Sequence, residues 1–249
     1  MKRITLVVVL VTWLAGETTV ACEQPQAGDN KRESRAPSSI EKVQLPEPKY
    51  DGKISVERAL RERRTVRSYE DEPLTLSEIS QLLWAAQGIT ERDKGLRTAP
   101  SAGALYPLEV YLVVGNVEGV KQGAYKYNPH EHQLTRIKDG DVRGEFGAAL
   151  GQSGAGEAGA VIVFFGVYER ATVKFGEIGI RYVHMEVGHA AQNVYLQATA
   201  LNLGTGVIGG FPESRIKRIL NVREEEQLLY IMPVGRIRPD GEREPQQKR

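Results

Sequence analysis

The sequence of 249 residues predicts an α+β domain that follows a targeting signal and a flexible tether. From about residue 50, helical and strand-like patterns are mixed without regular βαβ units, which favours α+β over a parallel-sheet fold. An apolar run near the N-terminus is followed within a few residues by the only cysteine, and a proline-rich stretch comes after the cysteine. The folded domain is therefore expected at residues 50–240, with residues 241–249 as a polar tail.

The composition excludes several classes of protein. The chain carries 33 Lys and Arg against 32 Asp and Glu, so it lacks the basic footprint of a nucleic-acid binder. One cysteine cannot close an intramolecular disulfide or build a cysteine-based metal cluster. An apolar fraction of 41% with 26% charged residues is typical of a globular domain rather than of disorder.

Residues 1–21 have the organisation of a signal peptide. Two basic residues precede an apolar run over residues 4–15, which is shorter than the roughly 20 residues of a membrane span. We expect cleavage before Cys22 and lipidation of Cys22, although Thr19 stands where lipoprotein signals usually have Leu. The mature chain would carry equal numbers of acidic and basic residues, so lipid alone would attach it to a membrane. A plain secretory signal and a retained cytosolic N-terminus are the alternatives.

Residues 22–49 are predicted to be a flexible tether. Residues 23–49 contain four prolines and no aromatic residue, so this stretch cannot bury enough surface to offset the entropy of ordering.

The first two helices are predicted from their caps. Ser55 is a candidate N-cap for a helix over residues 56–64. Thr75 and Glu78 have the spacing of a capping box, and apolar residues follow at helical spacing until Gly88.

The remaining elements are predicted from periodicity and turn residues. Strands are expected over 108–114, 161–168 and 228–234, and a hairpin is expected from 124–127 and 133–137. Helices are expected over 142–150, over 180–203 and from Pro212 to Leu220. Gly188 inside the long helix suggests close packing at that point.

Two glycine motifs and a histidine pair resemble ligand sites but lack the required context. Residues 154–159 and 204–209 match G-x-G-x-x-G, yet both follow helical patterns and lead toward strand-like residues, unlike a Rossmann motif. His130 and His132 have no further cysteine or histidine nearby, so a solvated hairpin turn is favoured over a metal site.

Two segments have the residue types of a phosphate-bearing ligand site. Residues 61–67 (RERRTVR) place four arginines and a threonine together, which suits a phosphate but also a solvated helix end paired with nearby carboxylates. Residues 100–107 (PSAGALYP) form a turn of small residues between two prolines, where backbone groups could approach a flat ligand.

Five motifs in order make the sequence resemble the nitroreductase-like flavoprotein superfamily, and within it the SagB-type dehydrogenase branch. They are residues 63–67 (RRTVR), 100–107 (PSAGALYP), 186–193 (EVGHAAQN), 206–211 (GVIGGF) and 232–236 (MPVGR). The resemblance runs from about Val56 to Arg238. It implies a central, mostly antiparallel sheet flanked by helices, a homodimer, and non-covalent FMN at the dimer interface.

The resemblance also implies which residues bind the cofactor. Those expected to hold the flavin phosphate, ribityl chain and ring are Arg63, Arg64, Thr65, Arg67, Pro100, Ser101, Ala102, Gly103, Gln192, Ile208, Gly209, Gly210 and Arg236. The 100–103 loop is expected to come from the partner subunit. An arginine near the pyrimidine edge would stabilise the charge of reduced flavin, and a backbone N–H near N5 would fix the ring.

Lys174 is the candidate catalytic residue. Azoline-oxidising members of the branch carry a Lys-Tyr pair just before the long helix, whereas this chain has Lys174 followed by Phe175. A lysine can act as a base when an apolar pocket favours its neutral form. A surface lysine is the alternative, and the missing phenol puts azoline oxidation in doubt.

The sequence therefore predicts an exported FMN-dependent oxidoreductase that passes hydride from a donor such as NAD(P)H, through flavin N5, to a small electrophile. A dehydrogenase of a heterocycle or peptide, with Lys174 as base, is the second hypothesis. A tethered flavin-binding redox carrier without its own turnover is the third.

Overall fold

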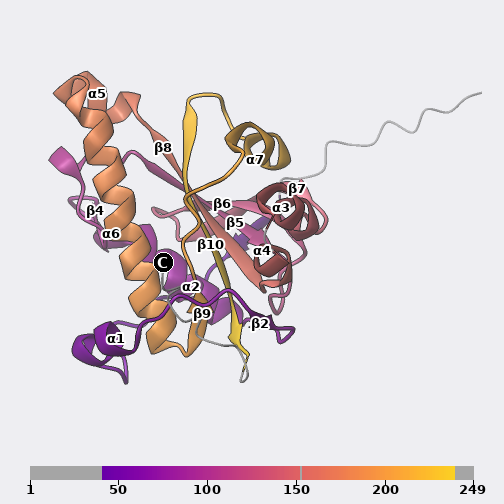
Figure 1. The fold of residues 1–249 in the computed structure, drawn as a ribbon. Coiled ribbons are helices and arrows are strands. Elements are labelled where there is room, and N and C mark those ends of the chain that lie inside the picture. The colour runs from indigo at the N-terminus through magenta and orange to yellow at the C-terminus, as the bar shows by residue number, and fades with distance from the viewer. Residues whose placement is uncertain (1–40, 152, 239–249) are drawn as a thin grey trace, which may run out of the picture. The chain divides into compact units, whose positions relative to one another are not determined.

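A computed structural model describes residues 41–151 and 153–238, which fold around one antiparallel sheet (Figure 1). The strand order is β1 (Lys42–Gln44), β7 (Gln133–Asp139), β6 (Gly123–Asn128), β5 (Leu108–Val114), β8 (Ala160–Val167), β10 (Glu226–Ile237) and β2 (Tyr69–Glu70), and β9 (Leu203–Thr205) also pairs with β10. A separate small hairpin is formed by β3 (Ile89–Glu91) and β4 (Leu96–Arg97).

Helices cover both faces of the sheet, so the described residues form three layers (Figure 1). On one face lie α1 (Val56–Glu62), α2 (Leu76–Gln87), α5 (Glu169–Phe175) and α6 (Ile178–Ala200). On the other lie α3 (Arg143–Leu150), α4 (Ser153–Glu157) and α7 (Glu213–Leu220).

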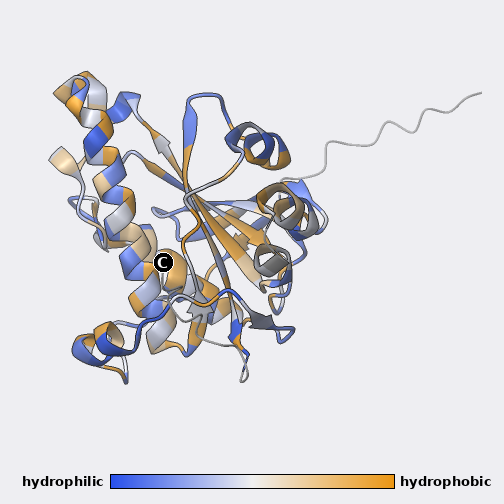
Figure 2. Cartoon of the chain, viewed as in Figure 1, coloured by the Kyte–Doolittle hydropathy of each residue, from blue (hydrophilic) through white to orange (hydrophobic). Residues whose placement is uncertain are grey.

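The central strands are apolar on both sides, as Figure 2 shows. In β8, Ile162 and Phe164 belong to the core beneath α2 and α6, whereas Val163 and Phe165 belong to the core beneath α3 and α7. Successive strand side chains point to opposite faces, so a continuous apolar run is what a doubly covered strand requires.

The helix caps and the hairpin, which depend on neighbouring residues, are present as the sequence predicts. Ser55 accepts a hydrogen bond from the backbone N–H of Arg58, and Thr75 with Glu78 forms both bonds of the capping box. The 124–137 hairpin is confirmed as β6 and β7, and Pro212 stands immediately before α7. The long helix is α6, although it begins and ends earlier than expected because Leu203 joins β9.

The boundary of the folded domain at Tyr50 is wrong for residues 42–49. β1 pairs with β7, and Leu45 is buried. Ser80 Oγ donates to the carbonyl of Pro46, and the Gln81 amide bonds both the N–H and the carbonyl of Lys49. This stretch is therefore fixed to α2 rather than being part of a tether.

Two smaller expectations also fail. A Cβ on Gly188 would meet no atom within 4 Å in the described chain, so the close packing suggested there is not made within it. His132 is buried rather than solvated: its ring nitrogens lie 2.9 Å from the Tyr127 hydroxyl and 2.7 Å from Ser80 Oγ.

The predicted signal peptide with Cys22, the tether up to residue 40 and the polar tail from residue 241 lie outside the described residues. Within residues 41–151 and 153–238, no helix combines the length and apolar character that a membrane crossing requires.

Candidate active site

The arginine-rich segment after α1 lies against Gly154 and Gly206. The N–H of Val66 donates to the carbonyl of Thr205 over 2.9 Å. A Cβ on Gly206 would stand 2.9 Å from a methyl carbon of Thr65, and one on Gly154 would stand 2.1 Å from the carbonyl oxygen of Arg67. Glycine is therefore required where the backbone of residues 63–67 passes between α4 and the chain after β9.

Tyr195 of α6 joins this segment to the chain after β9. Its hydroxyl accepts the N–H of Val207 over 2.8 Å and lies 3.3 Å from Thr65 Oγ1. The guanidinium of Arg63 stacks over its ring, 5.0 Å from the centroid. We call these four residues (Arg63, Thr65, Tyr195 and Val207) the Tyr195 cluster, and they unite two of the sequence-predicted segments.

Ile208, Gly209 and Gly210 differ in what they offer to a ligand. Ile208 is buried, and it exchanges both backbone hydrogen bonds with Ile231 of β10. Gly209 and Gly210 are exposed, and a Cβ on Gly210 would meet nothing within 4 Å. The Ile208 N–H is therefore committed, so a backbone donor for a ring nitrogen would have to come from the two glycines.

The 100–107 loop is held in an unusual conformation. Gly103, Ala104 and Tyr106 have positive φ angles of 63°, 54° and 46°, which is costly for the two residues with a Cβ. Ser101 Oγ accepts the N–H of Tyr106 over 2.9 Å, and Arg170 donates to the Tyr106 carbonyl over 3.1 Å. Side chains outside the loop thus help to fix its shape.

Lys174 lies beside this loop. Its Nζ would be 2.8 Å from a Cβ on Gly103, and it stands 5.4 Å from the ring centre of Phe175. Phe175 in turn makes an edge contact with Tyr182 at 5.2 Å between ring centres. Lys174 is exposed in the described chain, so the apolar pocket expected around it is not formed there.

Glu186 is a buried carboxylate behind the loop. It is only 3% exposed, and its Oε1 has no hydrogen-bond partner among the described residues. Burial raises the pKa of Glu186 to about 7, against opposing contributions from Ser101, Arg97 and Gln87. We call these four residues (Gln87, Arg97, Ser101 and Glu186) the Glu186 cluster; at neutral pH its carboxyl group is partly protonated.

Three other predicted residues lie apart from Tyr195. Arg64 donates to the carbonyls of Arg61 and Arg63 and is exposed. Gln192 is exposed on α6. Arg236 donates to both oxygens of Glu78, over 2.6 and 2.9 Å.

The sequence resemblance predicts that Arg236 reaches the flavin phosphate, and in the described chain its guanidinium is paired with Glu78. Burial alone would raise the pKa of Glu78, but the bonds from Arg236 and Thr75 hold that pKa below its usual value. Arg236 is therefore committed to the N-terminus of α2.

The two clusters lie on opposite sides of α6. Glu186 and Tyr195 are nine residues apart, which corresponds to about 14 Å along the axis and half a turn around it. Pro100, Ala102 and Gly103 share the loop of Ser101, whereas Thr65 and Gly206 share the side of Tyr195. Within one chain, the sequence-predicted residues next to α6 thus lie in two separate groups rather than one.

The sequence reasoning assigned no role to Glu186, Arg97 or Tyr195. Glu186 could have been identified from the sequence, because a carboxylate stands in the apolar stripe of Val183, Val187 and Ala190. Arg97 and Tyr195 could not, since their roles depend on partners distant in sequence.

The family comparison matches most of the described chain. A model of the nitroreductase family matches residues 60–236. A Methanocaldococcus jannaschii protein that carries the name of a nitroreductase is 48% identical over 195 residues, which is 78% of this chain and 96% of that protein.

A peptide-processing relative and a solved structure match as well. The microcin B17-processing protein of Escherichia coli is 28% identical over 60% of this chain, and the match spans 57% of that protein. A crystal structure from Ralstonia eutropha, also described as a nitroreductase, has a TM-score of 0.71 and 27% identity, and covers 82% of this chain and 92% of its own.

Proposed function

Because this chain belongs to the nitroreductase family, with relatives in its SagB-type branch, we propose that it is an FMN-dependent oxidoreductase acting on a small electrophile. The observation that carries the proposal is Arg63. Its guanidinium is half-buried on the Tyr195 ring, and no carboxylate of the described residues lies within ion-pair distance. A phosphate or a flavin oxygen would supply the missing negative partner.

The residues around Arg63 fit such a cofactor. Thr65 adds a hydroxyl next to the Tyr195 hydroxyl, and Gly209 and Gly210 leave open backbone for a flat ring. Bound FMN would supply two-electron hydride chemistry at its N5 atom. Arg63 would stabilise negative charge, and the Tyr195 hydroxyl would hold Thr65 and Val207 in position through bonds already present.

We also propose that the active form is a homodimer. A helix about 10 Å thick separates the Tyr195 cluster from the 100–103 loop, so one flavin that contacts both needs the loop of a second copy. A test is to co-express Arg63→Gln and Ser101→Ala chains. In mixed dimers, one of the two sites should recover the flavin affinity that is weakened in each variant alone, whereas a single-chain site would show no recovery.

The direct test of function uses the full chain. Purified protein should bind added FMN with a change in flavin absorbance. After anaerobic reduction, nitroaromatics or quinones should reoxidise the bound flavin. Failure to bind FMN would refute the proposal, and binding without reoxidation by any acceptor would favour a redox carrier.

A second reaction is favoured by the position of Lys174 beside Gly103. In this alternative, Lys174 removes a proton from a heterocycle or peptide while the substrate is oxidised, in line with the peptide-processing relative. Lys174→Ala should then abolish turnover and leave FMN affinity unchanged. The matched control is Lys94→Ala, which removes an exposed lysine paired with Glu91. Equal turnover of the two variants would exclude Lys174 as the base.

We propose in addition that the protein is exported and anchored through lipid on Cys22. The support is the sequence of residues 1–22 alone. Mass spectrometry of membrane-extracted protein should find a diacylglyceryl-modified Cys22 at the N-terminus, and Cys22→Ser should release the protein from the membrane. Residues 1–21 still attached to an unmodified Cys22 would contradict this.

A further inference from the structure

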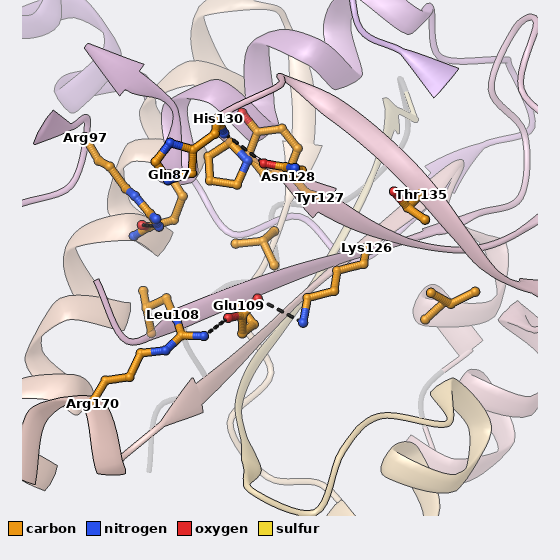
Figure 3. Close-up of a pocket in the computed structure, with 13 residues that line it drawn as sticks. Gln87, Arg97, Leu108, Glu109, Lys126, Tyr127, Asn128, His130, Thr135 and Arg170 are labelled. Atoms are coloured by element: carbon orange, nitrogen blue, oxygen red, sulfur yellow. Dashed lines mark hydrogen bonds and ion pairs between the residues drawn. The ribbon is translucent and has the colours of Figure 1, made fainter. Parts of the chain in front are cut away.

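A cavity lies beside strands β5, β6 and β7 (Figure 3). Its volume is about 490 Å³, which is the size of a small-molecule site. Strands β5, β6 and β7 form its floor, with Arg97 from β4 and Arg170 from α5 at its edge. No residue of the Tyr195 cluster and no predicted flavin ligand lines it.

Two of its cations are already neutralised. Glu109 lies between Lys126 and Arg170 and bonds both of them, as Figure 3 shows. Lys126 also forms an ion pair with buried Glu226 over 2.9 Å. The two positive and two negative charges of this group cancel, so none of them requires a charged ligand as a partner.

Arg97 is the uncompensated cation. It donates to Gln87 Oε1 over 2.9 Å and stacks on Tyr106 at 4.6 Å, but no carboxylate of the described residues lies within ion-pair distance. Burial lowers its pKa, and Glu186 and Glu109 oppose this only through longer-range attraction. A half-buried guanidinium in this position is stabilised by an anionic partner.

Two buried donors at the same place lack acceptors. Gln87 is 1% exposed, and neither its Nε2 nor the Nε of Arg97 has a hydrogen-bond partner in the described part of the chain. Figure 3 shows the two side chains next to each other at one end of the cavity. Buried donors without acceptors are rare and costly, and the two oxygens of a carboxylate would satisfy both.

The remainder of the cavity suits an apolar body. Next to the polar end, the wall of the cavity includes the apolar edges of Leu108, Val110 and Tyr127, which are otherwise buried. Arg97 contributes one positive charge, and the neighbouring Glu186 is partly protonated at neutral pH. The local excess of positive charge is therefore at most one unit, which matches one negative charge rather than a phosphate dianion.

We propose that this cavity is a binding site for a small organic monocarboxylate, with its carboxylate on Arg97 and Gln87 and its apolar body along Val110 and Tyr127. No predicted flavin ligand lines the cavity, although Arg97 and Gln87 share the Glu186 cluster with Ser101; the test requires neither FMN nor turnover. Arg97 also contacts Tyr106, so the side chain that would bind the acid lies directly against the 100–107 loop.

The test is ¹⁹F NMR of 4-fluorobenzoate with the full chain. We expect saturable broadening of the probe signal, with an affinity at least about tenfold higher than that of neutral 4-fluorobenzamide. Arg97→Gln should weaken benzoate binding about tenfold or more. Arg92→Gln, an exposed arginine on the same β3–β4 hairpin, should leave it unchanged. Equal binding by the two variants, or equal binding of the acid and the amide, would overturn the proposal.

His130→Trp guards against a folding defect in the Arg97 variant. His130 is exposed and lines the cavity beside Gln87 (Figure 3), so a larger ring there would fill the space at the polar end and leave Arg97 in place. With the circular dichroism spectrum unchanged, this variant should lose benzoate binding. Unaltered binding would place the acid elsewhere and would overturn the proposal.

Discussion

The two sides of α6 are built differently. On the Tyr195 side, backbone lies directly on backbone, and the Tyr195 hydroxyl accepts the Val207 N–H. On the Glu186 side, buried Glu186 and Gln87 each keep an atom without a partner among the described residues, and the neighbouring loop has positive φ angles at Ala104 and Tyr106.

This contrast indicates that the Tyr195 side is held in place by its own contacts, whereas the Glu186 side depends on what surrounds it. Close glycine contacts make the Tyr195 side rigid before any ligand binds. Unsatisfied polar atoms make the Glu186 side sensitive to protons, water or ligands. Substitutions on the two sides of α6 test this contrast.

The largest effect is expected for Gly154→Ala. The new methyl group would stand 2.1 Å from the Arg67 carbonyl oxygen, so either α4 or residues 63–67 must move. We expect a loss of about 3 kcal/mol in the free energy of unfolding, measured by urea denaturation. Gly144→Ala in α3 has open space around it and should instead gain about 0.5–1 kcal/mol. Equal effects of the two variants would show that the tight contact at Gly154 is absent.

Glu186→Gln should change how stability depends on pH. The pKa of Glu186 is raised in the folded chain, so the wild type loses stability as pH rises from about 4.5 to about 7 and then reaches a plateau. A glutamine at this position does not ionise and carries no such loss, so the variant should be more stable above pH 7 by up to about 3 kcal/mol. Denaturation at pH 5 and pH 8 measures this, and a pH-independent difference would contradict it.

Tyr195→Phe should cost about 1–2 kcal/mol in the free energy of unfolding. The variant leaves the Val207 N–H without its acceptor and keeps the ring beneath Arg63. Tyr168→Phe is the control, because its hydroxyl contacts His184 at an exposed site and should contribute less than about 0.5 kcal/mol. Similar losses of stability in both variants would mean that the Tyr195 hydroxyl does not hold the chain at Val207 in place.

The smallest effect is expected for Arg64→Gln. Comparing it with Arg63→Gln distinguishes two adjacent arginines for which the sequence predicts the same role. Arg63→Gln should weaken FMN binding about tenfold because Arg63 faces the Tyr195 side without an ionic partner among the described residues. Arg64→Gln should change it about twofold or less because Arg64 bonds only the end of α1. Fluorescence titration of FMN measures both, and the reverse order would place the phosphate at the exposed end of α1.

How much could be predicted from the sequence depended on the distance between partners. Ser55, Thr75 with Glu78, and the β6–β7 turn act through neighbours in the chain, and the sequence predicted all of them. β1 was missed because its three residues form a strand only by pairing with β7, about 90 residues away.

In the candidate site, too, only features that depend on neighbouring residues could be predicted from the sequence. The five motifs identified the family and the segments that meet at Tyr195. They could not reveal that Glu78 holds Arg236, 158 residues away, or that Lys174 is exposed. These properties arise from tertiary contacts that no local pattern encodes.

The attachment of residues 41–49 has a mechanical consequence. A pull applied at Glu41 would first load the Glu41–Arg136 ion pair and the three-residue β1. It would next load the bonds of Pro46 and Lys49 to α2, well before reaching Arg63. Residues 41–49 would therefore carry a force applied at the N-terminus before it reached the Tyr195 side.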